Sequence, residues 1–209
     1  MSKELVKRIL SSIILLPLVF YFLTSGSFLL ILFIVLCLII TFYEWNKMSK
    51  NKLYKIVGFI FLLFSFYTFY ELSIELFPLI YVILICISTD TGGYVFGKIF
   101  NGPKLTTISP KKTYAGALGG YLLSLICLLT ITKFIDYQGT ILKLFFITIL
   151  LSTVSQIGDI IISYFKRQAG VKNTGNLIPG HGGLLDRIDG MIFAVPIFHL
   201  IKFTELTNI

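Results

Sequence analysis

The sequence predicts an all-α, polytopic integral membrane protein, and three observations lead to that prediction. Hydrophobic residues make up 56% of the 209-residue chain and charged residues only 13%. The mean hydropathy of +0.90 lies far above the usual range for a soluble domain. Uncharged apolar runs recur along the chain, and the basic residues gather mainly in alternate connections between them. Runs of this kind favour membrane-spanning helices.

Seven apolar runs are the candidate spans. Several are shorter than the roughly 20 residues that cross a hydrocarbon core, but flanking polar residues can extend each helix. We therefore expect about seven transmembrane helices in a single transmembrane domain, residues 1–209. The runs are residues 9–23, 28–43, 56–70, 77–89, 116–132, 144–158 and 191–201.

The distribution of basic residues predicts the orientation of the chain. With seven spans and a cytoplasmic N-terminus, only Lys133, Lys143 and Lys202 of the 18 basic residues fall on the outer side. This asymmetry is the expected topology signal. The net charge of +8 therefore needs no nucleic-acid partner, and anionic lipid headgroups can account for it. We expect a multi-pass protein of the cell inner membrane with its polar loops on the cytoplasmic side.

The first apolar run has a second interpretation, a cleaved signal peptide, because Lys7 and Arg8 precede it. No small-x-small cleavage site follows Leu23 cleanly. The segment 24–27 is instead typical of a tight turn between two spans. We expect the run to be retained.

Two long polar loops, residues 90–115 and 159–190, contain most of the unusual chemistry. Asp90, Asp159, Asp186 and Asp189 lie at their membrane-proximal ends. Acidic residues at such positions cost free energy unless they are paired, solvated or bound to a cation. They are therefore candidates for a functional site.

In the first loop, the segment Ser109-Pro110-Lys111-Lys112-Thr113 precedes a helix that we expect to begin near Ala115. Thr113 can cap this helix. Lys111 and Lys112 would then stand beside free backbone N–H groups, which together suit an anion. The alternative, that the two lysines only enforce topology, stays open.

In the second loop, Asp159, Ser163, Lys166 and Arg167 share one face if the preceding helix continues through Asp159. An acid, a hydroxyl and two bases on one face suit a metal-bound polyphosphate.

Asp186 and Asp189 are three residues apart, so in a helix both carboxylates would project from one face. They could merely complement a helix dipole. However, Arg187 lies between them and His181 precedes them. Paired carboxylates with nearby bases are typical of magnesium-assisted chemistry on phosphates.

These segments resemble the phosphatidate cytidylyltransferases, or CDP-diacylglycerol synthases. The resemblance covers about residues 88–190, which we expect to hold the catalytic loops and spans, between the N-terminal spans (1–87) and the last span and tail (191–209). It rests on Ser163-Tyr164-Phe165-Lys166-Arg167, Lys172, Pro179-Gly180-His181-Gly182-Gly183-Leu184-Leu185-Asp186-Arg187-Ile188-Asp189, Gly158-Asp159, Asp90 with Gly93-Tyr94, and Ser109-Pro110-Lys111-Lys112-Thr113 with Gly116.

The resemblance implies a magnesium-dependent nucleotidyltransferase of phospholipid biosynthesis. Such an enzyme transfers CMP from CTP to phosphatidic acid, giving CDP-diacylglycerol and pyrophosphate. It implies a homodimer if the chain follows the family, and it leaves open a second cation. We expect Asp159, Asp186 and Asp189 to bind Mg²⁺, directly or through water, and Lys166 and Arg167 to act with them. The substrate-binding candidates are Asp90, Ser109, Lys111, Lys112, Ser163, Lys172, His181 and Arg187.

The chain departs from the family pattern at three positions. The family commonly has acids where Ala115, Ile162 and Asn173 stand. Either these acids are dispensable or the protein is a weakened or repurposed member.

Two other functions stay open. A related transferase could act on another lipid phosphate, such as a prenylated glycerol phosphate. A transporter could bind a cation with the acids at the membrane edge, although acids near span centres and an internal repeat would then be expected.

Overall fold

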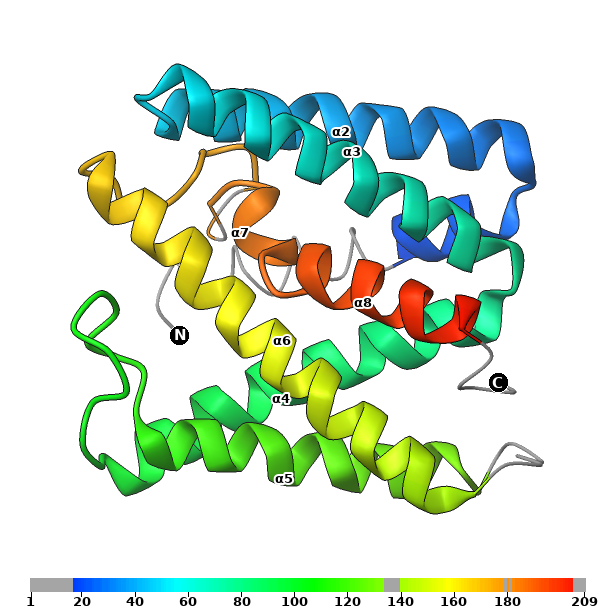
Figure 1. Ribbon diagram of the computed structural model, residues 1–209, viewed down its shortest axis with the longest axis vertical. Helices are drawn as coiled ribbons and strands as arrows, with labels where there is room; N and C mark the ends of the chain where they lie inside the picture. Colours follow the sequence, from blue (N-terminus) through cyan, green and yellow to red (C-terminus); the bar gives the residue numbers. More distant parts are fainter. Residues whose placement is uncertain (1–16, 134–139, 179, 181, 205–209) are drawn as a thin grey trace. The chain divides into compact units, whose positions relative to one another are not determined.

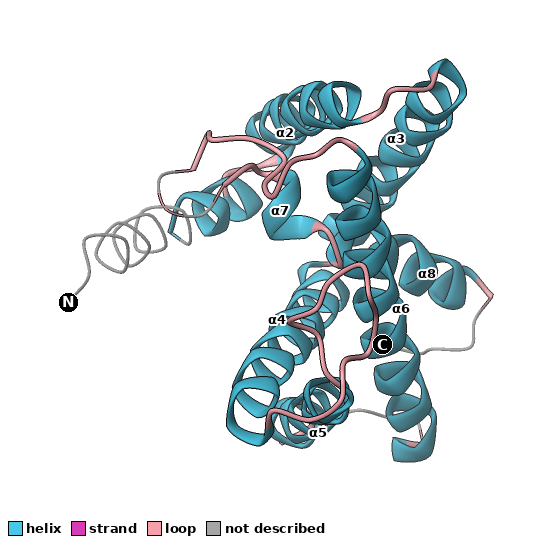
Figure 2. Cartoon of the chain, turned by 90° about the vertical axis from the view of Figure 1, so that its left-hand side faces the viewer, coloured by secondary structure: helices cyan, strands magenta, loops and turns pink. Residues whose placement is uncertain are grey.

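The computed structural model describes residues 17–133, 140–178, 180 and 182–204, and these residues form helices and loops without a strand (Figure 2). Among the described residues, five helices are long and apolar enough to cross a membrane. They are α2 (Ser27–Met48), α3 (Lys52–Ile74), α4 (Leu76–Phe100), α5 (Tyr114–Ile131) and α6 (Ile141–Gln168), followed by the short α7 (Leu185–Ile188) and the apolar α8 (Met191–Phe203) (Figure 1). The prediction of an all-α polytopic membrane protein is confirmed.

The predicted runs and the observed helices correspond closely. The runs 28–43, 56–70, 77–89 and 144–158 each lie within one long helix, and the run 191–201 lies within α8. The run 116–132 lies within α5 except for its last residue. At 13 residues, α8 is shorter than the roughly 20 residues of a simple span. Residues 9–16 of the first run lie outside the described residues. Residues 17–24 are helical. The number of seven spans, the cytoplasmic N-terminus and the single domain stay predictions.

The predicted start of each polar loop is wrong. Helix α4 continues to Phe100 and α6 continues to Gln168, so Asp90 and Asp159 lie within helices. Glycines after Asp90 lie against α5, where the lack of a side chain permits close packing.

The chain divides into two compact units, which are described separately. The first consists of residues 1–70 and 165–188, and the second of residues 71–164 and 189–209. In the first unit, α2 and α3 form a helical hairpin in which the rings of Phe42 and Phe59 lie 4.5 Å apart. Trp45 of α2 lies over Gly58, and its Nε1 donates to the carbonyl of Tyr54 at 3.0 Å.

In the second unit, glycines bring α4 and α5 into backbone contact. A Cβ atom placed on Gly92 would lie 2.2 Å from the carbonyl oxygen of Gly119. Polar side chains connect α4 to α6: the hydroxyls of Tyr81 and Thr148 lie 2.7 Å apart, and Thr89 donates to Ser152 at 2.9 Å.

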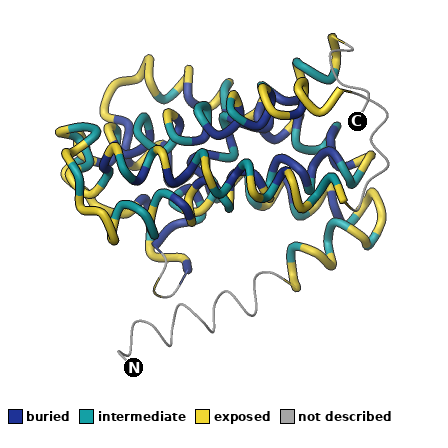
Figure 3. Tube along the Cα trace, turned by 90° about the horizontal axis from the view of Figure 1, so that it is seen from below, coloured by how far each residue is buried: buried dark blue, intermediate teal, exposed yellow. Residues whose placement is uncertain are grey.

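Large apolar side chains are exposed along all of the long helices, and exposed and buried positions alternate around them (Figure 3). Phe28 of α2, Ile60 of α3 and Leu118 of α5 are examples, with 60–74% of each residue's surface exposed. Exposed apolar surface on this scale is unfavourable in water. Lipid chains would cover it, in agreement with the membrane assignment.

The contact between α4 and α5 can be tested by substituting Gly92. We expect Gly92→Ala to lower the apparent melting temperature of the purified protein, because the new methyl group meets backbone atoms of Gly119 and Gly120 closer than 3 Å. Overpacking of this kind costs about 1–3 kcal/mol. The matched control is Gly93→Ala, whose Cβ would meet only the Gly116 oxygen at 3.8 Å. Equal melting temperatures for the two variants would contradict the close contact.

Candidate functional site

A cavity of about 320 Å³ lies within the second unit, formed by α4, α5, α6 and the loop before α5. Six of the predicted site residues line it, namely Asp90, Ser109, Lys111, Lys112, Asp159 and Ser163. The sequence interpretation therefore identified residues that the fold brings together, although they come from segments far apart in the chain. Thr89, Tyr94 and Gln156 add further polar groups.

The loop before α5 folds back on itself and leads into a capped helix. The N–H of Leu105 donates to the carbonyl of Lys112 at 2.8 Å, and the N–H of Lys112 donates to that of Ser109 at 3.0 Å. Thr113 Oγ1 then accepts from the N–H of Gly116 at 3.0 Å. The predicted Thr113 cap is confirmed, and it places Lys111 and Lys112 just before the positive end of a helix dipole.

Asp159 of α6 lies between a cation and a hydroxyl. Lys112 Nζ lies 2.7 Å from Asp159 Oδ2, and Ser163 Oγ donates to Asp159 Oδ1 at 3.3 Å. The continuous α6 helix confirms the helical spacing predicted from Asp159 to Arg167. Both side chains line the cavity and are partly exposed, but the Lys112 ammonium nitrogen itself is buried against Asp159.

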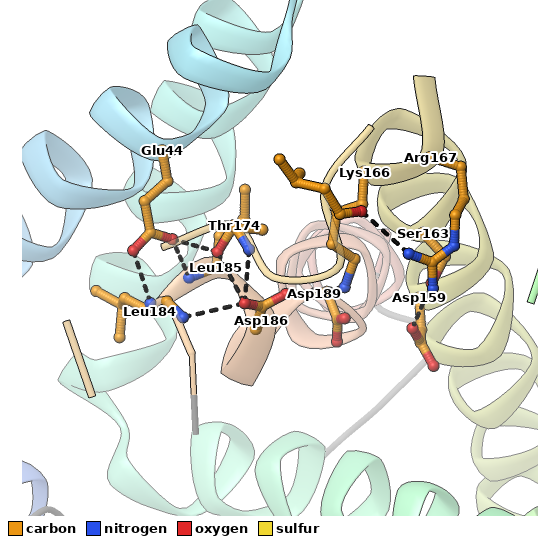
Figure 4. Close-up of polar contacts among 12 residues, drawn as sticks. Glu44, Asp159, Ser163, Lys166, Arg167, Thr174, Leu184, Leu185, Asp186 and Asp189 are labelled. Atoms are coloured by element: carbon orange, nitrogen blue, oxygen red, sulfur yellow. Dashed lines mark hydrogen bonds and ion pairs between the residues drawn. The ribbon is translucent and has the colours of Figure 1, made fainter. Parts of the chain in front are cut away.

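The first unit contains a second polar cluster, centred on Asp186 of α7 (Figure 4). Lys166 Nζ lies 2.8 Å from Asp186 Oδ1, with both side chains at most 10% exposed. Asp186 Oδ2 accepts from the N–H groups of Thr174 at 2.7 Å and Gly183 at 3.0 Å, and the Thr174 hydroxyl oxygen lies 3.1 Å from it. The described contacts thus engage both carboxylate oxygens.

The surroundings of Asp186 also change its titration. Burial raises the pKa of the carboxyl group, but the hydrogen bonds from Lys166, Gly183 and Thr174 outweigh it, and the net pKa lies below the ordinary value. The ionised carboxylate therefore stabilises the fold fully above the ordinary Asp pKa of about 3.9. This contribution is lost as the pH falls through the lower pKa of the folded protein.

Sequence reasoning missed Glu44, near the end of α2. Only 4% of this residue is exposed. Its carboxylate accepts from the N–H groups of Leu184 and Leu185 and from the Thr174 hydroxyl, at 2.7–2.9 Å. The available signal was an acid directly after an apolar run, where a charge is costly unless it is satisfied.

The other predicted site residues have separate positions. Arg167 Nη1 donates to the carbonyl of Val171 at 3.0 Å, close to the end of α6. Lys172 and Arg187 are exposed. Asp189 is 8% exposed and follows α7, which ends at Ile188, so the expectation of both carboxylates within one helix is wrong. His181 lies outside the described residues.

The three departures from the family pattern occupy different surroundings. Ile162 is 2% exposed within α6, where an apolar side chain is favourable. Ala115 is half-buried and Asn173 is exposed. Nothing in the structure explains the absence of acids at Ala115 and Asn173.

Lys166→Met should strongly destabilise the protein, because it leaves Asp186 buried without its cation. Loss of one partner of a buried ion pair costs about 3–5 kcal/mol, which thermal or denaturant unfolding would measure. The double variant Lys166→Met/Asp186→Asn should lose less than the sum of the two single variants, because neither charge is then left alone. Strict additivity would contradict a coupled pair.

The chain is similar to proteins of one family. A model of the Cytidylyltransferase family matches residues 6–77 and 53–204. The phosphatidate cytidylyltransferase of Staphylococcus aureus (strain COL) is 39% identical over 167 residues, covering 76% of this chain and 64% of the relative. The enzyme of the same name from Staphylococcus haemolyticus (strain JCSC1435) is 42% identical over 124 residues, covering 59% of this chain and 48% of the relative.

The chain spans 64% of the length of the S. aureus relative. The match to the family includes the cavity of the second unit and the Asp186 cluster of the first. It also extends through α2 and α3, for which the sequence had indicated only apolar spans. Because the family model covers most of its length, the chain belongs to the cytidylyltransferase family.

Proposed function

We propose that this protein is a CTP:phosphatidate cytidylyltransferase that transfers CMP from CTP to phosphatidic acid, forming CDP-diacylglycerol and pyrophosphate. The observation that carries the proposal is the cavity lined by Lys111, Lys112, Asp90 and Asp159. Its lysines can neutralise phosphate oxygens, and its carboxylates are oxygen ligands of the kind that a divalent cation takes. The names of the related Staphylococcus enzymes supply the reaction.

The reaction needs positioning and charge neutralisation more than acid–base chemistry. A phosphate oxygen of the lipid attacks the α-phosphorus of CTP, a new P–O bond forms, and the bond to the β-phosphate oxygen breaks to release pyrophosphate. The attacking phosphate monoester is already anionic at neutral pH, so no general base is needed. Lys111 and Lys112 would bind phosphate oxygens beside the N-terminus of α5, and Ser109 and Ser163 would donate hydrogen bonds to them.

The donor set of the cavity fits Mg²⁺. Asp90, Asp159, Ser163 and Gln156 all line it, and carboxylate, hydroxyl and amide oxygens are the ligands that magnesium prefers. Asp159 and Asp90 would hold the ion, with Lys112 moving from Asp159 toward a phosphate. Bound Mg²⁺ would neutralise charge on the triphosphate and the leaving pyrophosphate. A second cation stays part of the proposal.

Asp186 and Asp189 also stay proposed metal ligands. For Asp186, Oδ2 already accepts from Thr174 and Gly183, whereas Oδ1 accepts from Lys166. Direct ligation would use the remaining lone pair of Oδ1 or displace a donor. Contact through water would keep these hydrogen bonds. Arg167, Lys172, His181 and Arg187 are proposed to bind the phosphates of the substrates. The proposal also places the protein in the inner membrane as a homodimer, with the site on the cytoplasmic side.

The direct test is an assay of the full chain purified in detergent, with labelled CTP, phosphatidic acid and Mg²⁺. We expect labelled CDP-diacylglycerol from the wild type. Asp159→Asn should lower the turnover at least about 100-fold, since it removes a charge that the transition state uses while preserving shape. Glu75→Gln, at an exposed ion pair with Lys202, is the control and should stay active. The absence of product from a folded wild type would refute the proposal.

Removal of the metal gives an independent test. Excess EDTA should abolish turnover, and added Mg²⁺ should restore it, because the triphosphate charge is otherwise only partly neutralised. The measurement is the initial rate against free Mg²⁺ concentration. Full activity in excess chelator would exclude the proposed metal role while leaving the transferase assignment intact.

A further inference from the structure

We propose that Glu44 is a positioning residue, which fixes the segment that carries Asp186 and thereby the catalytic geometry. The proposal rests on the transferase function proposed above. Glu44 lies near the end of α2, about 130 residues before its partner Thr174. A buried carboxylate that accepts three hydrogen bonds from one short segment has a role beyond membrane packing, for which an apolar side chain would suffice.

The Glu44 carboxylate binds the start of α7. Glu44 Oε1 accepts from the N–H of Leu184 at 2.9 Å, and Oε2 accepts from that of Leu185 at 2.8 Å. These two N–H groups immediately precede Asp186. By holding two consecutive peptide units, the Glu44 carboxylate sets the direction in which the chain presents Asp186 (Figure 4).

Thr174 contacts the carboxylates of both Glu44 and Asp186. Its hydroxyl lies 2.7 Å from Glu44 Oε2 and 3.1 Å from Asp186 Oδ2. A hydroxyl has a single hydrogen, so it donates to one carboxylate at a time, and the shorter contact favours Glu44. The N–H of Thr174 remains on Asp186 at 2.7 Å. Glu44 thus orients the same residue whose backbone binds Asp186.

Two glycines of the segment lie close to the Glu44 carboxylate. A Cβ atom on Gly183 would lie 2.1 Å from Thr174 Oγ1 and 2.5 Å from either oxygen of Glu44. A Cβ on Gly175 would lie 2.8 Å from Glu44 Oε1. Only glycine lets the backbone approach the carboxylate this closely at Gly183. The glycines of this region therefore fit a binding site for the Glu44 side chain.

The consequence for catalysis passes through Asp186 and Lys166. Lys166 is paired with Asp186, so a displaced segment would move both charges. Misplacement by about 1 Å can cost on the order of 100-fold in rate, and loss of a residue that orients a ligand typically costs about 10–100-fold. We expect Glu44→Gln to lower kcat about 10–100-fold and to change the KM for CTP by less than about threefold.

Glu44→Gln is informative because it preserves shape. Its amide oxygen can still accept from one N–H, while its NH₂ group replaces an acceptor and faces a second donor. Hydrogen exchange resolved to single amides supplies a readout that does not depend on activity. The amides of Leu184 and Leu185 should exchange about 10–100-fold faster than in the wild type, since they lose hydrogen bonds to a charged acceptor.

The decisive amides are those of Thr174 and Gly183, which bind Asp186. Faster exchange there would show that the loss of Glu44 reaches Asp186. A merely local role would leave these two amides unchanged, would lower the melting temperature, and would leave kcat per folded molecule within about twofold of the wild type. That result would overturn the proposal.

Variants of Thr174 keep the test decisive if Glu44→Gln does not fold. Thr174→Val removes the hydroxyl at nearly constant shape and should lower kcat, whereas Thr174→Ser should restore it. Wild-type kcat in a folded Thr174→Val would contradict the proposal. Glu75→Gln is again the matched control. Hydrogen exchange at the amides of Thr174 and Gly183, and kcat, should equal those of the wild type.

Failure of the two proposals can be told apart. If the wild type makes no CDP-diacylglycerol, the transferase assignment fails, and the exchange rates at Thr174 and Gly183 alone decide whether Glu44 positions Asp186. If the wild type is active and Glu44→Gln exchanges faster but turns over normally, only the positioning role fails.

Discussion

A charge that leaves water must find its partners within the protein, and the polar segments of this chain depend on that constraint. Ionised carboxylates are costly in an apolar environment unless hydrogen bonds or an opposite charge replace the lost water. Asp186 has Lys166 and two backbone N–H groups. Glu44 has the two N–H groups that begin α7. Between α6 and α7, the N–H groups of Thr174, Gly183 and Leu184 thus donate to these two acids.

The second unit satisfies the same constraint in a more open form. Asp159 pairs with Lys112, and both side chains are partly exposed at the cavity, although Lys112 Nζ itself is buried against the carboxylate. In a partly exposed ion pair, either residue can exchange its partner for a phosphate or a cation at lower cost than in a buried pair, because water compensates during the exchange. The buried pair Lys166–Asp186 is therefore suited to maintaining structure, and the partly exposed pair Lys112–Asp159 to reversible ligand binding.

The sequence predicted the helices and much of the cavity but not the buried network. Apolar runs revealed the spans because lipid selects for continuous hydrophobicity, and Thr113 was recognisable as a cap from its immediate neighbours. The boundaries at Asp90 and Asp159 failed because each acid ends an uncharged apolar run, and a charged residue inside a packed helix resembles the start of a polar loop. Glu44 was missed because its partners lie 130 to 141 residues away, and no local pattern encodes a contact at that separation.

The position of Trp45 has a practical consequence. It is the only tryptophan of the chain, it directly follows Glu44, and its ring lies 4.7 Å from that of Phe165. Indole emission responds to the polarity around the ring, so the protein carries an intrinsic optical reporter beside its buried acids. Its spectrum can follow the packing of α2 against the end of α6 in detergent or in vesicles, without a label and without turnover.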